Sequence, residues 1–246
     1  AMRRLALLAF TLACTPPPPD PNVIEQSGSV SIRRDVVRIA APKPPANPFT
    51  GSATPDELDA VTVVRYRVDT GTKPPRPARA IVLLMPGFMG GAGSFDSLAR
   101  GIVRRSTADD VLEAWAIDRR SNAMEDRAGI EAALLAKNPD LLTGYYFSGE
   151  AVNGQTFAGF KKQEDVAFES EWGLVSTMND LRAVVATIPA EQRRARVVLA
   201  GHSLGAGLAS MYAAWDFDGV AGFSELAGLV LIDGVTGNEG QPLTTI

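Results

Sequence analysis

The chain has 246 residues, of which 46% are hydrophobic and 21% are charged, and this is enough apolar material for one sizeable core. Its formal net charge of −4 argues against nucleic-acid binding, which requires a basic surface. One cysteine and one histidine cannot build a zinc site, and no acidic loop has calcium-binding spacing, so we expect no metal and no other cofactor.

The first residues have the pattern of an export signal. Two arginines precede an apolar run that is far shorter than the ~20 residues of a membrane-spanning helix, so we expect residues 1–13 to be a signal peptide. Residues 14–29 are expected to form a proline-rich tether. Cys14, the first residue after the expected signal peptide, resembles the lipidated cysteine of a bacterial lipoprotein. This resemblance implies that a lipid anchors the protein to a membrane. Thr15 at the next position favours the outer membrane, and a periplasmic or secreted protein without lipid is the alternative.

Two β-strands are expected before the main part of the domain. Residues 30–39 and 60–68 are rich in β-branched residues, and a proline-rich loop at 42–55 separates them. A second loop at 71–77 leads into an apolar strand at 80–86.

A glycine-rich loop follows the strand at 80–86, with the sequence Pro-Gly-Phe-Met-Gly-Gly-Ala-Gly at 86–93. The loop contains no lysine, so it is not a phosphate-binding loop of the G-x-x-x-x-G-K type, and it does not fit G-x-G-x-x-G. It is either an ordinary turn between a strand and a helix or a source of backbone N–H groups beside a catalytic residue.

Predicted strands and helices alternate from residue 80 onward. They are a helix at 94–105, a strand at 111–117, helices within 123–137 and 164–188, and a strand at 196–201. This alternation predicts a parallel sheet with right-handed crossovers. One apolar stripe in 164–188 has helical spacing and is expected to face the core, and its members are Phe168, Trp172, Val175, Leu181, Val185 and Ile188.

The segment 139–162 is longer than a plain connection and is expected to be a loop. Among its glycines it carries the aromatic residues Tyr145, Tyr146, Phe147, Phe157 and Phe160. Two interpretations stay open. The aromatic side chains either form part of the wall around a substrate acyl group or belong to a surface insertion that buries its own aromatics.

The most informative motif is Gly201-x-Ser203-x-Gly205, which lies between the strand at 196–201 and a predicted helix at 204–215. This is the layout of a nucleophile elbow, in which glycines two residues either side of the serine remove Cβ atoms that would clash. Ser203 is then the nucleophile, and the N–H of Leu204, at a helix N-terminus, stabilises a developing oxyanion. A plain turn between a strand and a helix is the alternative.

The elbow gives the glycine-rich loop its possible role. The N–H of Phe88 or Met89 is the expected second oxyanion donor beside Ser203.

With these two motifs, residues 60–235 resemble a bacterial serine hydrolase of the α/β-hydrolase superfamily, of the lipase and esterase kind. The resemblance implies a mostly parallel central sheet with helices on both faces, in a domain that we place at 30–246. Pro86-Gly87 stands where the family usually has His-Gly. Residues 111–122 resemble the family's next strand and its exit loop, in which we interpret Asp118 and Arg120 as ion-pairing or capping residues.

The only histidine departs from this family's pattern. His202 lies inside the elbow next to Ser203, where it cannot approach the serine hydroxyl as a base, and we expect it to pack locally. In this fold the acid and the base follow the serine, so we expect a C-terminally truncated chain that ends after about the sixth strand, with the base histidine beyond residue 246. The strand at 229–232 is then an exposed apolar edge. A natural hydrolase-like protein without triad chemistry is the alternative.

Asp233 ends the strand at 229–232 and is the best candidate for the acid. It is either the triad acid or a strand-end residue that lines the site. Asp216, Asp218 and Glu225 follow the elbow helix too closely to reach a histidine, and we interpret them as solvated loop charges.

These observations predict a serine hydrolase that cleaves small-molecule or lipid carboxylic esters through an acyl-enzyme at Ser203. The chain on its own is expected to be inactive without its histidine. A membrane-tethered binding protein that kept the fold without the reaction and an acyltransferase are the other hypotheses.

Overall fold

The computed structural model describes residues 20, 22–27, 30–69, 76–107 and 109–234 of the chain. The expected signal peptide, Cys14 and most of the expected tether lie outside these residues. Among the helices of the described part, none is both long and apolar enough to cross a bilayer.

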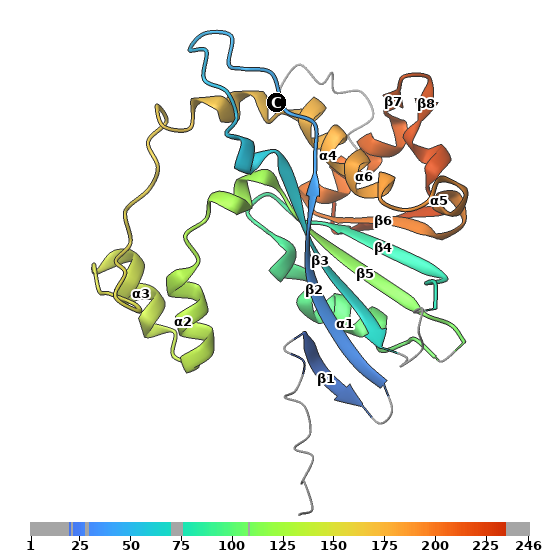
Figure 1. The fold of residues 1–246 in the computed structure, drawn as a ribbon, viewed down its shortest axis with the longest axis horizontal. Coiled ribbons are helices and arrows are strands. Elements are labelled where there is room, and N and C mark those ends of the chain that lie inside the picture. Colours follow the sequence, from blue (N-terminus) through green and yellow to red (C-terminus); the bar gives the residue numbers. More distant parts are fainter. Residues whose placement is uncertain (1–19, 21, 28–29, 70–75, 108, 235–246) are drawn as a thin grey trace, which may run out of the picture.

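The main sheet has seven strands in the order β1-β2-β3-β5-β4-β6-β9 (Figure 1). The strands are β1 Val23–Ser27, β2 Val30–Ala40, β3 Ala60–Asp69, β4 Ala80–Met85, β5 Leu112–Asp118, β6 Val197–His202 and β9 Gly228–Ile232. The pairs β5-β4, β4-β6 and β6-β9 are parallel, and the pairs that join β1, β2, β3 and β5 are antiparallel. β2, β4, β5, β6 and β9 thus run in one direction and only β1 and β3 in the other, so the expected mostly parallel sheet is confirmed.

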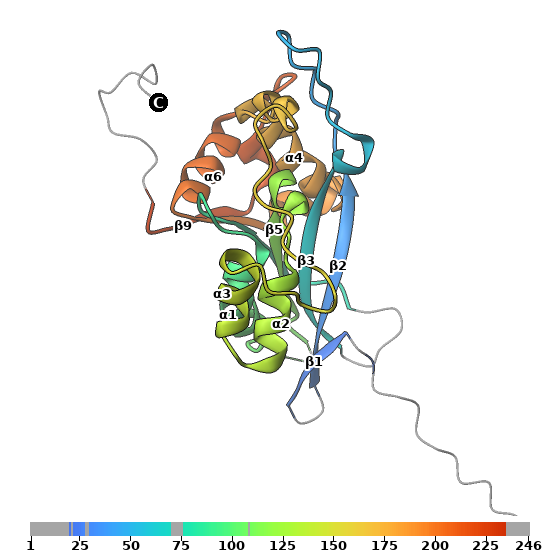
Figure 2. The same ribbon diagram turned by 90° about the vertical axis from the view of Figure 1, so that its left-hand side faces the viewer.

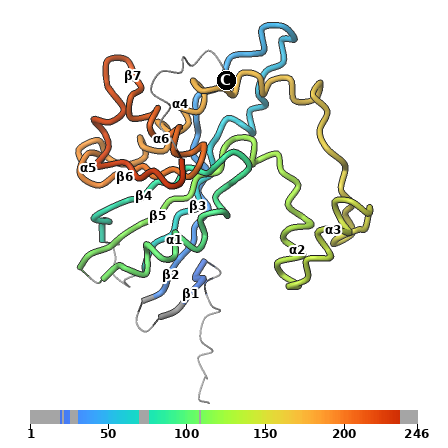
Figure 3. The backbone as a smooth tube through the Cα atoms, turned by 180° about the vertical axis from the view of Figure 1, so that it is seen from behind, coloured from blue at the N-terminus to red at the C-terminus, as the bar shows by residue number. Residues whose placement is uncertain are grey.

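Helices cover both faces of the sheet. The helices of the described residues are α1 Asp96–Val103, α2 Ala128–Ala136, α3 Asp140–Phe147, α4 Leu174–Ala186, α5 Ala190–Arg196 and α6 Leu204–Ala214, of which α2 and α3 stand apart from the sheet (Figure 3). Figure 2 shows α1 on one side of the sheet and α4 with α6 on the other. The core lies between these layers, and its largest fully buried side chains include Tyr66, Leu83, Met178 and Tyr212.

Two segments were expected to be irregular and are not. The expected tether reached residue 29, but Val23–Ser27 form β1 and pair with residues 30–33 of β2, so β1 covers the first part of that strand's edge. The expected loop at 139–162 contains α3. The N–H of Asp140, the first residue of α3, donates to Asn138 Oδ1 at 3.0 Å in the turn before the helix, although the N-cap residue Pro139 supplies no side-chain cap.

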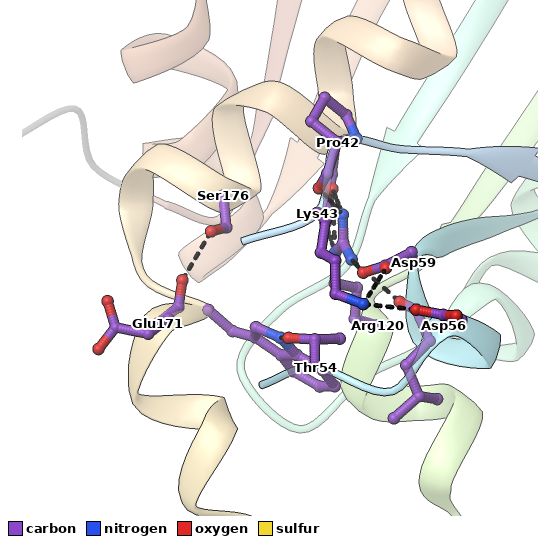
Figure 4. A network of polar contacts seen from close by, with 11 residues as sticks. Pro42, Lys43, Thr54, Asp56, Asp59, Arg120, Glu171 and Ser176 are labelled. Atoms are coloured by element: carbon purple, nitrogen blue, oxygen red, sulfur yellow. Dashed lines mark hydrogen bonds and ion pairs between the residues drawn. The ribbon is translucent and has the colours of Figure 1, made fainter. Parts of the chain in front are cut away.

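The helix predicted at 164–188 is wrong in its first half. A 3-10 turn at Ala167–Glu171 ends before Gly173, and α4 starts only at Leu174, because glycine weakens a continuous helix and Ser176 Oγ donates to the Glu171 carbonyl instead (Figure 4). The change of phase leaves Val175 61% exposed, so the predicted stripe fails there. Leu181, Val185 and Ile188 are buried as expected.

The C-terminal part of the described chain also differs from expectation. The short helix α5 and a hairpin of β7 Asp216–Phe217 with β8 Val220–Ala221 were not predicted. Glu225 is not a solvated loop charge, because α4 and α5 bring Arg182 and Arg193 to it, each at 2.7 Å. Asp216 and Asp218 are exposed, as expected.

Arg120 ties the segment before β3 to α4. Its guanidinium is 2% exposed and forms ion pairs with Asp180 at 2.7 Å and Asp59 at 3.1 Å. It also donates to the carbonyls of Pro42 and Leu58, and Figure 4 shows it among residues of this network. The structural role expected for Arg120 is confirmed.

We predict that Arg120→Met lowers the free energy of unfolding by about 3 kcal/mol, because Asp180 would keep a buried carboxylate without its partner. Arg79→Met is the control. The Arg79 side chain is 68% exposed in its pair with Asp110, so its loss should cost less than about 1 kcal/mol. Urea unfolding of the natural protein measures the loss of unfolding free energy in each variant. Equal losses in the two variants would contradict the buried network.

Candidate active site

Four loops meet at one edge of the sheet, where the parallel strands β4, β5, β6 and β9 end. The register places Met85 opposite Gly201, and Gly201 opposite Leu231, so these strands end at the same level. The loops that follow carry the glycine-rich segment after β4, the Asp118–Asn122 segment after β5, Ser203 after β6 and Asp233 after β9. The residues singled out from sequence are therefore brought together, as expected for the carboxyl edge of an open parallel sheet.

Ser203 sits at a sharp bend between β6 and α6. Its backbone angles are φ 54° and ψ −121°, a region that residues other than glycine rarely adopt, and its side chain is exposed. Its N–H donates to the Ile232 carbonyl at 3.0 Å, and its carbonyl accepts from Ala206 N–H at 3.0 Å. The strained, exposed turn predicted for Ser203 is present.

Gly201 and Gly205 make this bend possible. A Cβ on Gly201 would overlap the Gly205 carbonyl, and a Cβ on Gly205 would overlap the carbonyls of Met85 and Pro86. The elbow helix therefore lies directly against the end of β4. No side chain fits between these backbones.

The glycine-rich loop lies beside the serine. A Cβ placed on Gly87 would be 3.2 Å from Ser203 Cβ. The loop turns tightly, with Gly90 N–H donating to the Gly87 carbonyl at 3.1 Å. Within the described residues, the N–H groups of Phe88, Met89 and Leu204 have no acceptor, so all three stay available to a ligand oxygen.

The loop after β5 holds the glycine-rich loop in place. Asp118 accepts a hydrogen bond from Ala92 N–H at 2.5 Å, which agrees with the capping role expected for it. The Arg119 guanidinium donates to the carbonyls of Gly87, Phe88 and Gly90. Asn122 fixes the Arg119 backbone by accepting from its N–H at 2.8 Å. Sequence reasoning missed Arg119, although a run of charged residues directly after a buried strand was a usable signal.

A cavity of about 660 Å³ opens between these loops and the helices α4 and α6. Its apolar wall includes Met85, Ile117, Leu181, Leu208 and Met211. Leu204, which follows Ser203 at the bend, and Phe88 of the glycine-rich loop line the same cavity. The volume is in the range of pockets that bind small organic molecules.

Charged residues also line the cavity. Burial raises the pKa of the Glu169 carboxyl, and Lys161 offsets part of that effect. Burial also raises the pKa of Asp180, against the hydrogen bond from Arg120. Burial lowers the pKa of Arg119, against the charge of Glu125. The cavity is therefore lined by both apolar and charged side chains.

His202 and Asp233 lie beside the elbow without contacting each other through a hydrogen bond or an ion pair in the described part. His202 is exposed, but its Nδ1 lies against the glycine-rich loop, 3.4 Å from a Cβ placed on Gly87, which agrees with the expected local packing. The strand β6 ends at this residue and turns its side chain out of the core. Asp233 is exposed at φ 46°, and Gly234 after it lies so close to the Ser203 carbonyl that a Cβ there would be 2.5 Å from the oxygen. Asp233 thus lies at the elbow, as either interpretation of it requires.

The aromatic residues of 139–162 do not line this cavity. Tyr145 and Tyr146 donate to Asp126, and Phe157 packs against both rings and against Phe160. Figure 3 shows α2 and α3 standing apart from the sheet. The structure therefore favours a surface insertion, in which Tyr145 is buried but Phe147 and Phe160 stay 74% and 84% exposed.

Among the described residues, no group of three or more His, Cys, Asp or Glu side chains is arranged to hold a metal ion.

Residues 81–245 match the sequence model of the alpha/beta hydrolase family. No curated protein sequence matches the chain.

Several solved structures are similar in fold. A presumed lipase from Sulfolobus solfataricus matches with 16% identity and a TM-score of 0.49, over 92% of this chain and 51% of its own. An esterase from Pyrobaculum calidifontis matches with 15% identity and a TM-score of 0.41, over 85% and 46%. A cold-adapted esterase from an Arctic intertidal metagenomic library matches with 15% identity and a TM-score of 0.40, over 84% and 62%. The chain spans about half the length of the first two.

We predict that Gly205→Ala lowers the free energy of unfolding by about 2 kcal/mol or more, because the new methyl group meets backbone that cannot move aside. Gly93→Ala in the neighbouring loop is the control, since nothing lies within 4 Å of its Cβ position, and its effect should stay below about 0.5 kcal/mol. Urea unfolding compares the two. A tolerated Gly205→Ala would refute the close approach of the elbow to β4.

Proposed function

We propose that this chain, which belongs to the alpha/beta hydrolase family, carries the nucleophile and the oxyanion site of a serine hydrolase that cleaves carboxylic esters. The observation that carries the proposal is Ser203. Its exposed hydroxyl group is held at a strained bend beside the glycine-rich loop, where a Cβ placed on Gly87 would be 3.2 Å from Ser203 Cβ. Within the described residues, the N–H groups of Phe88 and Met89 in this loop have no acceptor.

The proposed reaction has two stages. Ser203 Oγ attacks the ester carbonyl and forms the acyl-enzyme, while its proton passes through a base to the departing alkoxide. The N–H of Leu204 and the N–H of Phe88 or Met89 stabilise the negative oxygen of each tetrahedral intermediate. Water then attacks the acyl-enzyme and releases the acid.

The base is proposed to be a histidine outside this sequence. His202 is the one histidine of the chain, and its place beside Ser203 in the elbow prevents it from accepting the Ser203 proton in line. Asp233 stays the proposed acid among the described residues, or a residue that lines the site. Its support is its place next to the elbow.

The cavity supports an apolar substrate group. Its wall from β4, β5, α4 and α6 leads to Phe88 and Leu204, so an acyl group bound there would reach the serine with its carbonyl at the loop amides. We propose small-molecule or lipid esters as the substrate class.

The absence of a usable histidine also favours a second candidate, a binding protein that kept the fold without the reaction. Export and a lipid anchor at Cys14 are proposed from the sequence pattern of residues 1–29.

We predict that a fluorophosphonate probe labels the natural protein at Ser203, because the probe reports an activated serine. Ser203→Ala should abolish labelling and lower ester hydrolysis on the order of 10⁴-fold or more. Ser210→Ala in the same helix, whose hydroxyl group donates to the Ala206 carbonyl, is the matched control and should label normally. Mass spectrometry locates the adduct, and an unlabelled wild-type protein would favour the binding protein.

We predict that Leu208→Trp shortens the preferred acyl chain, because the indole would fill the cavity. Relative to wild type, kcat/KM for p-nitrophenyl octanoate should fall about tenfold or more, and the value for the acetate should change little. Leu135→Trp, at a residue of α2 that is 89% exposed, is the control for surface effects. An unchanged ratio of octanoate to acetate would show that the acyl group binds elsewhere.

A further inference from the structure

Two consecutive arginines after β5 have opposite electrostatic surroundings. The charge of Arg120 is neutralised by Asp59 and Asp180. Arg119 forms no ion pair within the described residues, and burial lowers its pKa. A cation that is partly removed from water and has no carboxylate partner costs free energy, so its position calls for a compensating role.

The partners of Arg119 are the carbonyls of the glycine-rich loop. Its Nη2 donates to the Gly87 oxygen at 2.8 Å, to the Phe88 oxygen, and to the Gly90 oxygen at 3.2 Å. A single nitrogen thus contacts three of the four carbonyls in the turn Gly87–Gly90. This set fixes the rotation of two successive peptide groups.

Those two peptide groups contain the proposed oxyanion donors. In a trans peptide the C=O and the N–H point in opposite directions. With the Gly87 carbonyl aimed at Arg119, the Phe88 N–H is aimed away from it. The Phe88 carbonyl directs the Met89 N–H in the same way.

The strand order determines what lies on the far side. β4 lies between β5 and β6, so Arg119 reaches the loop from the β5 side and Ser203 lies on the β6 side. The Cβ position of Gly87 faces Ser203 Cβ at 3.2 Å, whereas the Gly87 carbonyl accepts from Arg119. Amides turned away from Arg119 are therefore turned toward the serine.

From this geometry we infer that Arg119 is a positioning residue, which turns the amides of Phe88 and Met89 toward Ser203 and places beside them a positive charge that forms no ion pair within the described residues. The charge polarises the peptide groups that it contacts and stabilises negative charge at the oxyanion. This inference rests on the proposed function and adds to it the residue that prepares the oxyanion site before substrate arrives.

The test compares Arg119→Met, Arg119→Lys and wild type in the natural protein. Arg119→Met should lower kcat for p-nitrophenyl acetate and the rate of fluorophosphonate labelling about 10²-fold, with KM changed less than about threefold, because the donors act on the transition state. Arg119→Lys keeps the charge but not the planar fork, so its loss should be smaller. Arg79→Met, at the opposite end of β4, should leave both rates unchanged.

Thermal melting of each variant separates positioning from folding. If Arg119→Met melts early, Arg119→Lys provides the test, and a kcat loss at unchanged KM and unchanged melting temperature supports the inference. If the wild-type protein is labelled and both Arg119 variants are labelled at the wild-type rate, the inference is overturned and the proposed function stands. A wild-type protein that is not labelled would overturn both.

Discussion

The candidate site depends on one close approach of backbone to backbone, between the end of β4 and the start of α6. Gly205 lies so near the Met85 carbonyl that no Cβ fits, and Gly201 packs in the same way against Gly205. This contact brings the loop after β4 within reach of Ser203 and forces the serine into its unusual backbone angles. Packing of the core thereby supplies the free energy that holds a strained residue in place.

The segment after β5 divides two tasks between neighbouring residues. Arg120 points into the protein and joins the segment before β3 to α4 through a neutralised network. Arg119 donates to the glycine-rich loop and forms no ion pair within the described residues. Asp118 holds the glycine-rich loop by accepting from Ala92 N–H, and Asn122 holds the Arg119 backbone by accepting from its N–H. One short loop therefore serves both stability and the geometry of the proposed oxyanion site.

Local patterns in the sequence predicted the strands near 30–39, 60–68, 80–86 and 111–117, the elbow and the exposed edge, where Val230 of β9 is 45% exposed. They failed where tertiary contacts decide the outcome. Gly173 interrupts an otherwise helical stripe, and β1 exists because β2 offers it an edge. Glu225 and Arg119 gained their roles from partners distant in the sequence, which no periodicity reveals.

The central claim is that the amides of the glycine-rich loop and of Leu204 are already aimed at the oxygen that becomes negative when Ser203 attacks. A crystal structure of the natural protein with a phosphonate bound to Ser203 tests it most directly. We expect the phosphoryl oxygen at about 2.7–3.1 Å from the nitrogen of Leu204 and from that of Phe88 or Met89. A phosphoryl oxygen that points to solvent, with the loop amides more than one hydrogen-bond length away, would contradict the account.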